Sequence, residues 1–343
     1  MEALDRGRFE PVLIGIDRSG RWHLVDQKRF LVESDNQNII EDASVGACVA
    51  HLPIPGDRRL PESFASITEK GSPAQLDVCF PVLHGTYGED GTIQGFLKLA
   101  GIPFVGASVL GSCVGMDKDV MKRLLQQAGI PVAKFLVFGR HEISTITFET
   151  VAASLGKVCF VKPANLGSSV GISKADSAEK LAKSVAEAFN YDNKIIIEEA
   201  VNAREIECAV MGNENPKVAV PGEVATQSSH DFYDYDAKYI SAQGAKTIIP
   251  ADLSPEMVRK AQETAAGAYK ALCCEGLGRV DLFLKSDGAV LVNEINTLPG
   301  FTNISMYPKM WEASGVSYRD LISQLIDLGL ARFQSEARLQ TGV

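Results

Sequence analysis

The most informative stretch of this 343-residue sequence reads Gly278-Arg279-Val280-Asp281-Leu282-Phe283-Leu284-Lys285-Ser286-Asp287-Gly288-Ala289-Val290-Leu291-Val292-Asn293-Glu294-Ile295-Asn296. Two apolar runs flank an Asp-Gly pair, which is a strong signal for a β-hairpin with a two-residue turn. If the Asp-Gly pair forms that turn, Asp281 lies opposite Glu294 in the neighbouring strand. By the same register, Arg279 lies opposite Asn296.

Side chains alternate between the two faces of a strand, so these four polar groups are predicted to share one face. The opposite, apolar face is predicted to carry Val280, Leu282, Leu284, Leu291 and Ile295. Two carboxylates directly opposite each other in a sheet repel unless a positive charge lies between them. A hard divalent cation, held by carboxylate and amide oxygens, would supply that charge.

The shared face therefore makes Asp281, Glu294 and Asn296 candidate metal ligands. Magnesium is favoured over calcium, because two carboxylates and an amide leave coordination positions for phosphate oxygens. A solvated outer face with unrelated polar residues is the alternative. The presence of Arg279 in the same cluster favours the metal interpretation.

The composition indicates a globular protein with two or three domains, since hydrophobic residues make up 45% and charged residues 22% of a long chain. No apolar run approaches the roughly 18 residues of a membrane span, and acidic residues interrupt the start, unlike a secretory signal. The formal charge of -9 argues against general nucleic-acid binding. The seven cysteines have no C-x-x-C spacing, which favours reduced, buried thiols in a cytoplasmic protein.

Apolar runs alternate with helical stretches, and this pattern indicates an α/β architecture. Strands are predicted over residues 11–16, 76–83, 158–162 and 194–198, and helices over 117–129 and 177–190, with Asp117 as an N-cap. Residues 34–75 are polar and are expected to form surface excursions. The expected domains are 1–114, 115–200 and 201–343, the last with a tyrosine-rich loop near 226–244.

A Gly/Ser-rich loop follows the strand that ends at Lys162 and reads Pro163-Ala164-Asn165-Leu166-Gly167-Ser168-Ser169-Val170-Gly171. It does not match the P-loop pattern. It does offer backbone N–H groups freed by glycine, two hydroxyl groups and a lysine at a strand end, all of which suit phosphate. A plain turn is the alternative for such a loop alone. The lysine and the carboxylate hairpin together favour a phosphate loop.

Taken together, these motifs resemble the ATP-grasp superfamily and, within it, the D-alanine–D-alanine ligase family. The resemblance is carried by Leu83–Gly91, Met116–Lys118, Lys162–Gly171, Phe232–Tyr239, Gly278–Asp281 and Glu294–Met306, and it extends from about residue 9 to 330. It implies a three-domain ATP-grasp architecture, in which an N-terminal open α/β domain precedes two α+β domains that sandwich ATP.

The resemblance implies a cytoplasmic, ATP-dependent ligase of peptidoglycan synthesis. ATP phosphorylates the carboxylate of one D-alanine, and the amine of a second attacks the acyl phosphate to give D-alanyl-D-alanine. Two Mg²⁺ ions, which Mn²⁺ can replace, are implied as cofactors. A homodimer without nucleic-acid or membrane partners is also expected.

The resemblance further assigns roles to single residues. Lys118, Lys162 and Lys238 are implied to bind ATP under a closing loop that contains Ser168 and Ser169, while Glu198, Val201 and Glu205 bind adenine and ribose. Acids at a strand end need no function, so residue types alone support the adenine and ribose roles weakly. Asp281, Glu294 and Asn296 are implied to hold the metal ions.

At the substrates, the resemblance implies that Arg279 stabilises the oxyanion of the tetrahedral transition state. His84 is implied to approach the first D-alanine, with a structural histidine at a strand end as the alternative. The second D-alanine is implied to lie among Lys238, Gly300, Ser305 and Met306. Tyr239, hydrogen-bonded to Ser168 on a mobile loop, is implied to close the site against water.

The family begins with an earlier strand and a Gly-rich loop whose glutamate contacts the first D-alanine. This sequence starts at Met1-Glu2-Ala3-Leu4, in what resembles the following helix, and neither Glu2 nor Glu10 has matching neighbours. If the protein lacks that strand, the first D-alanine site is expected to be incomplete; a start codon assigned too late, or a shortened chain, is the alternative. The alternatives are a D-alanine–D-lactate or D-serine ligase, and a catalytically impaired ATP-binding homologue. The Lys238-Tyr239 pair favours D-alanine, because depsipeptide-forming relatives tend to carry a histidine on that loop.

Overall fold

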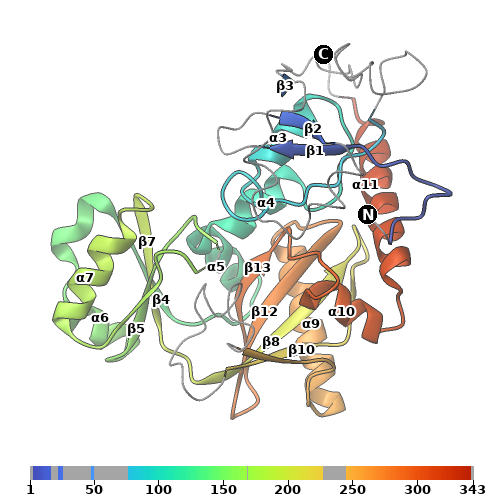
Figure 1. Ribbon diagram of the computed structural model, residues 1–343. Coiled ribbons are helices and arrows are strands. Elements are labelled where there is room, and N and C mark those ends of the chain that lie inside the picture. Colours follow the sequence, from blue (N-terminus) through green and yellow to red (C-terminus); the bar gives the residue numbers. More distant parts are fainter. Residues whose placement is uncertain are drawn as a thin grey trace. The chain divides into compact units, whose positions relative to one another are not determined.

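The computed structural model in Figure 1 describes residues 3–16, 22–25, 48–49, 76–167, 169–226 and 245–340. Ser168 lies outside these residues, and so does nearly all of the predicted lid loop, including Lys238 and Tyr239. Most of the excursion predicted for residues 34–75 lies outside them as well. Within the described residues, no helix is both long and apolar enough to cross a membrane.

The chain divides into two compact units, of which the first comprises Met1–Cys79 and Phe96–Phe104. Its described residues form an antiparallel sheet of β1 (Leu13–Ile16), β2 (Trp22–Val25) and β3 (Cys48–Val49). The strand predicted over 11–16 is confirmed as β1. The strand predicted over 76–83 is wrong: that segment contributes an isolated bridge from Cys79 to Phe104, and Pro81 cannot donate a ladder hydrogen bond.

The second unit comprises Phe80–Gly95 and Val105–Val343. One of its sheets has the antiparallel strand order β4-β7-β5-β6. The strands are β4 (Phe135–Gly139), β5 (Cys159–Pro163), β6 (Ser173–Ala175) and β7 (Lys194–Glu199), with the helices η1 (Arg140–Thr145), α6 (Phe148–Leu155) and α7 (Ala178–Ala188). The strands predicted at 158–162 and 194–198, and the helix at 177–190, are thus confirmed.

The core of this smaller sheet lies between its strands and the helices α6 and α7. Val151, Leu181 and Val185 from the helices pack against Val161 and Ile197 from the strands. Cysteines follow the predicted pattern in part. Cys159, Cys208 and Cys274 are buried free thiols, whereas Cys113 and Cys273 are exposed.

The larger sheet has the order β11-β10-β8-β12-β13, with β9 beside β8. Its strands are β8 (Ala203–Met211), β9 (Lys217–Val218), β10 (Gly222–Thr226), β11 (Ala245–Ile248), β12 (Leu277–Lys285) and β13 (Val290–Asn296). Helix α9 (Pro255–Ala271) packs against β8, β12 and β13. The remaining described helices are α3 (Thr92–Leu99), α4 (Val109–Met116), α5 (Lys118–Gln127), α10 (Met306–Ala313) and α11 (Tyr318–Glu336).

The β12–β13 hairpin pairs Asp281 with Glu294 and Arg279 with Asn296, which confirms the predicted pairs. The two-residue turn is wrong. Lys285 pairs with the carbonyl of Ala289 at 2.9 Å, so the loop has three residues and ends in Gly288 with φ 79°. The predicted pairs survive because β13 carries a bulge between the pairs Asp281–Glu294 and Leu282–Val292.

This bulge also changes which residues face the core. Val290 and Val292 join the buried cluster that contains Val280 and Leu282. Leu291, predicted on the apolar face, instead lies opposite Phe283 and is half-buried. The extra residue shifts the alternation by one position, so the apolar prediction fails at Leu291 while the polar pairs beyond the bulge keep their register.

Asp117 fixes the junction between α4 and α5. Its side chain accepts hydrogen bonds from the N–H groups of Asp119 and Val120, as predicted for an N-cap. The carboxylate also pairs with Lys194 on β7 at 2.7 Å and accepts a hydrogen bond from Asn165 Nδ2 at 3.0 Å. Since Asn165 lies at the base of the Gly/Ser loop, Asp117 ties the helix that carries Lys118 to that loop.

We predict that Asp117→Ala lowers the free energy of unfolding by about 2 kcal/mol, because it removes a helix cap together with a partly buried ion pair. Denaturant titration measures this loss. Ser177→Ala, which removes the cap of α7, is the matched control and should cost about 1 kcal/mol. Equal losses in the two variants would contradict a role of Asp117 beyond capping.

Candidate functional site

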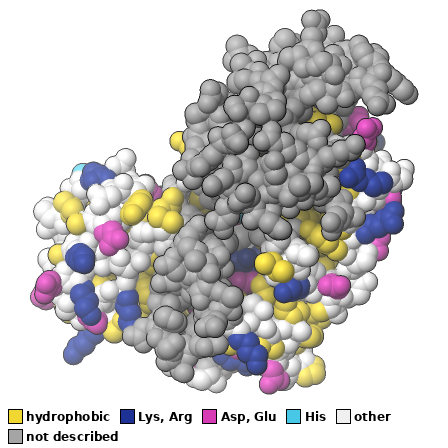
Figure 2. Space-filling model, in the orientation of Figure 1, with side chains coloured by type: hydrophobic (Ala, Val, Ile, Leu, Met, Phe, Trp, Pro, Cys, Tyr) yellow, Lys and Arg dark blue, Asp and Glu magenta, His cyan; other side chains and the backbone are white. Residues whose placement is uncertain are grey.

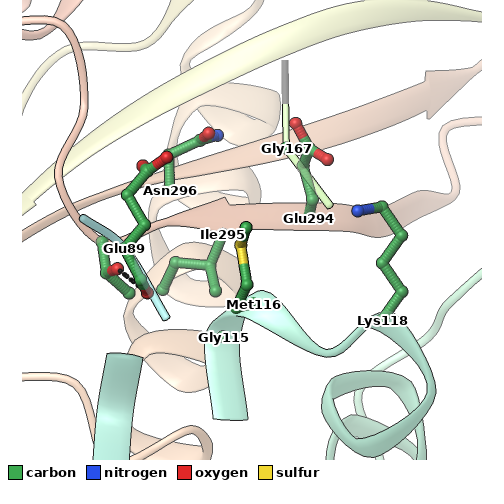
Figure 3. A pocket seen from close by; sticks show the side chains of 9 residues that line it. Glu89, Gly115, Met116, Lys118, Gly167, Glu294, Ile295 and Asn296 are labelled. Atoms are coloured by element: carbon green, nitrogen blue, oxygen red, sulfur yellow. Dashed lines mark hydrogen bonds between the residues drawn. The ribbon is translucent and has the colours of Figure 1, made fainter. Parts of the chain in front are cut away.

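Four segments that are distant in the sequence meet around one pocket of the second unit (Figure 3). They contribute Glu89, Met116 and Lys118, Gly167 of the Gly/Ser loop, and Glu294 and Asn296 from the end of β13. Each segment contains one of the motifs that carry the family resemblance. The structure therefore brings the predicted metal face, one predicted phosphate lysine and the predicted phosphate loop together.

Arg279 is the central positive charge of the carboxylate face. Its Nε and Nη2 donate to the two carboxylate oxygens of Asp281, both at 2.7 Å. Its Nε also lies 3.2 Å from Oε2 of Glu207 on the neighbouring strand β8. Burial would lower the pKa of Arg279, but the attraction of Asp281 and Glu207 outweighs it and holds the pKa well above its ordinary value. The guanidinium is thus permanently charged.

The donor chemistry of this face suits a hard cation. Asn296 donates from Nδ2 to Asp281 at 2.9 Å, which leaves its Oδ1 as the acceptor of the amide. Each carboxylate oxygen has two lone pairs, so the bonds from Arg279 do not exhaust Asp281. Among the described residues, no three His, Cys, Asp or Glu side chains converge on a metal position. The fit therefore rests on two carboxylates and one amide, together with the oxygens of a ligand.

Lys162 and Glu198 form a buried charge cluster with a second lysine. Glu198 accepts a hydrogen bond from Lys162 Nζ at 2.7 Å and lies 3.1 Å from Lys122 Nζ, whose side chain is 0% exposed. Burial alone would raise the pKa of Glu198, but the two lysines lower it to about 2. The Glu198 carboxylate already binds the two lysines. The predicted contact of Glu198 with adenine would therefore be made by its backbone in β7, not by its side chain.

Lys118 and Lys162 lie in different surroundings. Lys118 donates from Nζ to the carbonyl of Leu166 at 2.6 Å, which fixes the start of the Gly/Ser loop. Burial lowers the pKa of Lys118. The pKa of Lys162 is raised, because Glu198 outweighs burial, and Glu205 on β8 adds to the effect. Glu205 therefore lies near this cluster, while Val201 lies two residues beyond Glu199, the last residue of β7.

The Gly/Ser loop approaches the turn that carries Glu89. A Cβ atom added at Gly167 would lie 3.7 Å from Oε2 of Glu89 and 3.8 Å from Met116 Cε, within van der Waals contact. Ser169 has φ 58°, a left-handed conformation that non-glycine residues rarely adopt. The position of Ser169 is thus set by a tight turn, in keeping with a loop shaped to present backbone N–H groups.

Glu89 is a buried acid that faces Glu294 and Asn296 across the pocket (Figure 3). Its Oε2 accepts a hydrogen bond from the N–H of Gly85 at 2.6 Å. Burial raises the pKa of Glu89 to about 7, and the charge of Glu294 adds to the rise. Hydrogen bonds from the backbone of Gly85 and Leu298 oppose it.

His84 and the predicted second-substrate residues lie along the segment that follows β13. His84 Nδ1 is 3.1 Å from the carbonyl oxygen of Leu298. A Cβ atom added at Gly300 would lie 3.0 Å from Oγ of Ser305, so these two predicted residues are neighbours. Ser305 also precedes α10, whose first residue is Met306. The structure thus gathers the predicted second-substrate residues that it describes.

Comparisons with known proteins identify the family. Residues 1–107 match the family model described as D-ala D-ala ligase N-terminus, and residues 124–327 match the one described as D-ala D-ala ligase C-terminus. The chain belongs to the D-alanine–D-alanine ligase family. It is 51% identical to the D-alanine–D-alanine ligase of Shouchella clausii, over 100% of this chain and 92% of that relative. It is 46% identical to D-alanine–D-alanine ligase A of Escherichia coli K12, over 99% and 92%.

Solved structures of the D-alanine–D-alanine ligase family share the fold. The D-alanine–D-alanine ligase of Coxiella burnetii superimposes with a TM-score of 0.80 at 35% identity, over 98% of this chain and 90% of that one. The VanG D-Ala:D-Ser ligase of Enterococcus faecalis gives a TM-score of 0.81 at 35% identity, over 96% and 92%. The expected α/β ATP-grasp architecture is thereby confirmed.

Sequence reasoning missed two residues of this ligase-family site. Lys122 is spaced i, i+4 from Lys118, so both lie on one face of α5, and that spacing was a usable signal. Glu89 follows His84 in a Gly-rich turn, where an acid is ordinarily solvated. Nothing in the local pattern indicates its burial, which arises from contacts with residues 297–298.

We predict that Glu89→Gln gains stability relative to the native chain as the pH rises from 4.5 to 7. Unfolded glutamate loses its proton near pH 4.5, whereas folded Glu89 holds it to about pH 7. The native fold therefore becomes less stable through this window, by at most about 3 kcal/mol, and glutamine does not titrate. Thermal unfolding in chelator without nucleotide, at pH 5 and pH 8, measures the gain. The same difference between the variants at both pH values would contradict it.

Proposed function

We propose that this chain joins two molecules of D-alanine at the expense of ATP, the reaction for which its close relatives are named. The observation that carries the proposal is that Glu294 and Asn296, neighbours of Arg279 and Asp281 on the β12–β13 hairpin, share one pocket with Lys118 and Gly167 of the Gly/Ser loop. This arrangement occurs in a chain that aligns along its whole length with a D-alanine–D-alanine ligase. The product, D-alanyl-D-alanine, serves peptidoglycan synthesis.

The reaction has two halves. In the first, a carboxylate oxygen of one D-alanine attacks the γ-phosphorus of ATP, and ADP leaves as the acyl phosphate forms. In the second, the amine of another D-alanine attacks the acyl carbon, and inorganic phosphate leaves with the C–O bond electrons. The side chains do little covalent work, so positioning and charge neutralisation carry the catalysis.

Lys118 and Lys162 are the proposed phosphate-binding lysines. Both are nearly buried, and Lys162 is held in place by Glu198. Asp281, Glu294 and Asn296 would hold Mg²⁺, with two ions expected in this family and Mn²⁺ as a substitute. Bound there, the cation would neutralise negative charge on the phosphate oxygens. Glu198, Val201 and Glu205 are proposed to bind adenine and ribose.

Arg279 is the proposed oxyanion donor of the second half-reaction. Its fork to Asp281 uses Nε and Nη2, so Nη1 remains as the guanidinium donor for a developing negative charge. A fixed charge in a buried site stabilises a transition state without reorganising at the moment of reaction. His84 is proposed to approach the first D-alanine. Gly300, Ser305, Met306 and Lys238 are proposed to surround the second.

The remaining roles concern the lid and the larger organisation of the chain. Tyr239 and Ser168, with Ser169, are proposed to close the site against water. The domain division 1–114, 115–200 and 201–343 is likewise a proposal, supported by the two sheets of residues 135–199 and 203–296. We also propose that the protein is cytoplasmic and forms a homodimer.

A D-alanine–D-serine or D-alanine–D-lactate ligase is the second candidate. The VanG D-Ala:D-Ser ligase superimposes as well as the Coxiella ligase does, so the fold does not separate these reactions. A catalytically impaired ATP-binding homologue is the third candidate.

We predict that ADP release depends on D-alanine, with D-alanyl-D-alanine as the main product identified by mass spectrometry. The assay offers D-alanine alone, then D-alanine with D-lactate or D-serine. A mixed product formed in preference would favour the second candidate. Tight ATP binding without turnover of any of these substrates would favour the third candidate, a catalytically impaired ATP-binding homologue.

We predict that Arg279→Lys lowers kcat about a hundredfold and leaves the KM for ATP within about threefold of native. Lysine keeps the charge but not the planar fork. Steady-state kinetics measure both constants. Arg279→Ala should also lower kcat, with a lower melting temperature, because it leaves Glu207 and Asp281 without their buried counter-charge.

Arg204 provides a matched control for this prediction. On β8 it makes a similar fork to Glu223, with both distances at 2.7 Å, away from the pocket. Arg204→Lys should therefore keep native kcat. A kcat of Arg279→Lys close to that of Arg204→Lys would overturn the oxyanion role.

A further inference from the structure

The geometry points to Glu89 as a positioning residue that holds His84 in register with the segment that carries Asn296 and Gly300. This inference rests on the proposed function, because it concerns how the first-substrate side of the site is aligned with the metal and second-substrate side. It assigns to Glu89 no contact with a reacting atom.

The carboxylate of Glu89 connects the two sides through backbone groups. Its Oε2 accepts from the N–H of Gly85, next to His84, at 2.6 Å. The backbone of Leu298 also lies close enough to this buried carboxylate to lower its pKa against the effect of burial. A buried acceptor or donor that loses its hydrogen-bond partner is costly. One buried carboxylate thus holds the His84 turn against the chain just beyond β13.

Two further hydrogen bonds join the same segments. The carbonyl oxygen of Glu89 accepts from Thr297 Oγ1 at 3.3 Å. On the other side, His84 Nδ1 lies 3.1 Å from the carbonyl oxygen of Leu298. His84 therefore contacts Leu298, and Glu89 contacts the preceding residue, Thr297. Leu298 lies two residues from both Asn296 and Gly300. A shift of the turn would move His84 relative to both.

Such alignment matters because the two half-reactions require several groups within about 3 Å of the reacting atoms. A displacement of 1 Å can cost about a hundredfold in rate. In Figure 3 the Glu89 carboxylate points into the pocket toward Asn296 and Glu294. Its effect on the substrate would nevertheless come through His84 and Leu298, which carry the hydrogen bonds.

The neighbouring acid, Asp90, offers a matched control. Asp90 accepts from the N–H groups of Tyr87 at 2.8 Å and Thr92 at 3.0 Å, so it stabilises the same turn. It does not line the pocket of Figure 3. A residue that merely supports the turn should behave like Asp90. A residue that aligns His84 should not.

The test is a calorimetric titration of D-alanine into the native chain, Glu89→Gln and Asp90→Asn, each with a non-hydrolysable ATP analogue and magnesium. Glutamine keeps the shape but replaces one acceptor oxygen with an NH₂ group, so its single carbonyl oxygen can serve only one of the two sides, Gly85 or Leu298. We expect Glu89→Gln to weaken D-alanine binding about tenfold, with affinity for the ATP analogue within twofold of native. Asp90→Asn should bind both ligands as the native chain does.

A second variant tests the contact between the Glu89 turn and the segment after β13, by changing a residue of that segment. Thr297→Val removes the hydrogen bond to the Glu89 carbonyl and should weaken D-alanine binding by a smaller factor, about threefold. Melting temperatures of all variants show whether the fold is intact. Unchanged D-alanine affinity in Glu89→Gln, or the same loss in Asp90→Asn, would overturn the positioning role. So would a parallel loss of affinity for the ATP analogue.

The outcome separates this inference from the proposed function. If the native chain binds D-alanine and forms no dipeptide, the proposed function fails while the comparison of Glu89→Gln with Asp90→Asn still decides the positioning role. If the native chain does not bind D-alanine, both are overturned.

Discussion

The site depends on one buried charge, the guanidinium of Arg279. It lies between Asp281 on its own strand and Glu207 on the neighbouring strand, and it is bonded to Asp281 through a fork of two 2.7 Å hydrogen bonds. Without it, carboxylates on adjacent strands would face one another uncompensated, which is costly in a buried place. The same fork fixes the plane of the guanidinium. Folding of the large sheet and the proposed stabilisation of the oxyanion therefore use a single interaction.

A second charge cluster complements the first. Lys122 and Lys162 share the carboxylate of Glu198, and all three side chains are largely buried. Phosphate groups of ATP would offer further acceptors to ammonium groups of this kind, which suits the proposed role of Lys162. In Figure 2, basic and acidic side chains of the described residues are otherwise interspersed on the visible surface.

The sequence predicted the parts of the site that depend on local rules. The N-cap rule placed Asp117 at the start of α5. The predicted two-residue turn also gave the pair Asp281–Glu294, but that pair forms because the bulge in β13 offsets a three-residue loop. The bulge in β13 has no comparable local signal, so Leu291 was assigned to the wrong face. Lys122 and Glu89 acquire their roles from burial by distant segments, which a single sequence does not show. The roles of Lys238 and Tyr239 stay predictions, because these residues lie outside the described structure.

Asp281, Glu294 and Asn296, which surround Arg279, are proposed to form a metal centre, and Mn²⁺ binding in the presence of ADP tests this role. Electron paramagnetic resonance counts the bound ions in the native chain, Asp281→Asn, Glu294→Gln and the control Glu223→Gln, whose carboxylate pairs with Arg204 on the same sheet. We predict that Asp281→Asn and Glu294→Gln each weaken Mn²⁺ binding by about tenfold or more, while Glu223→Gln binds as the native chain does. Native affinity in both Asp281→Asn and Glu294→Gln would contradict it.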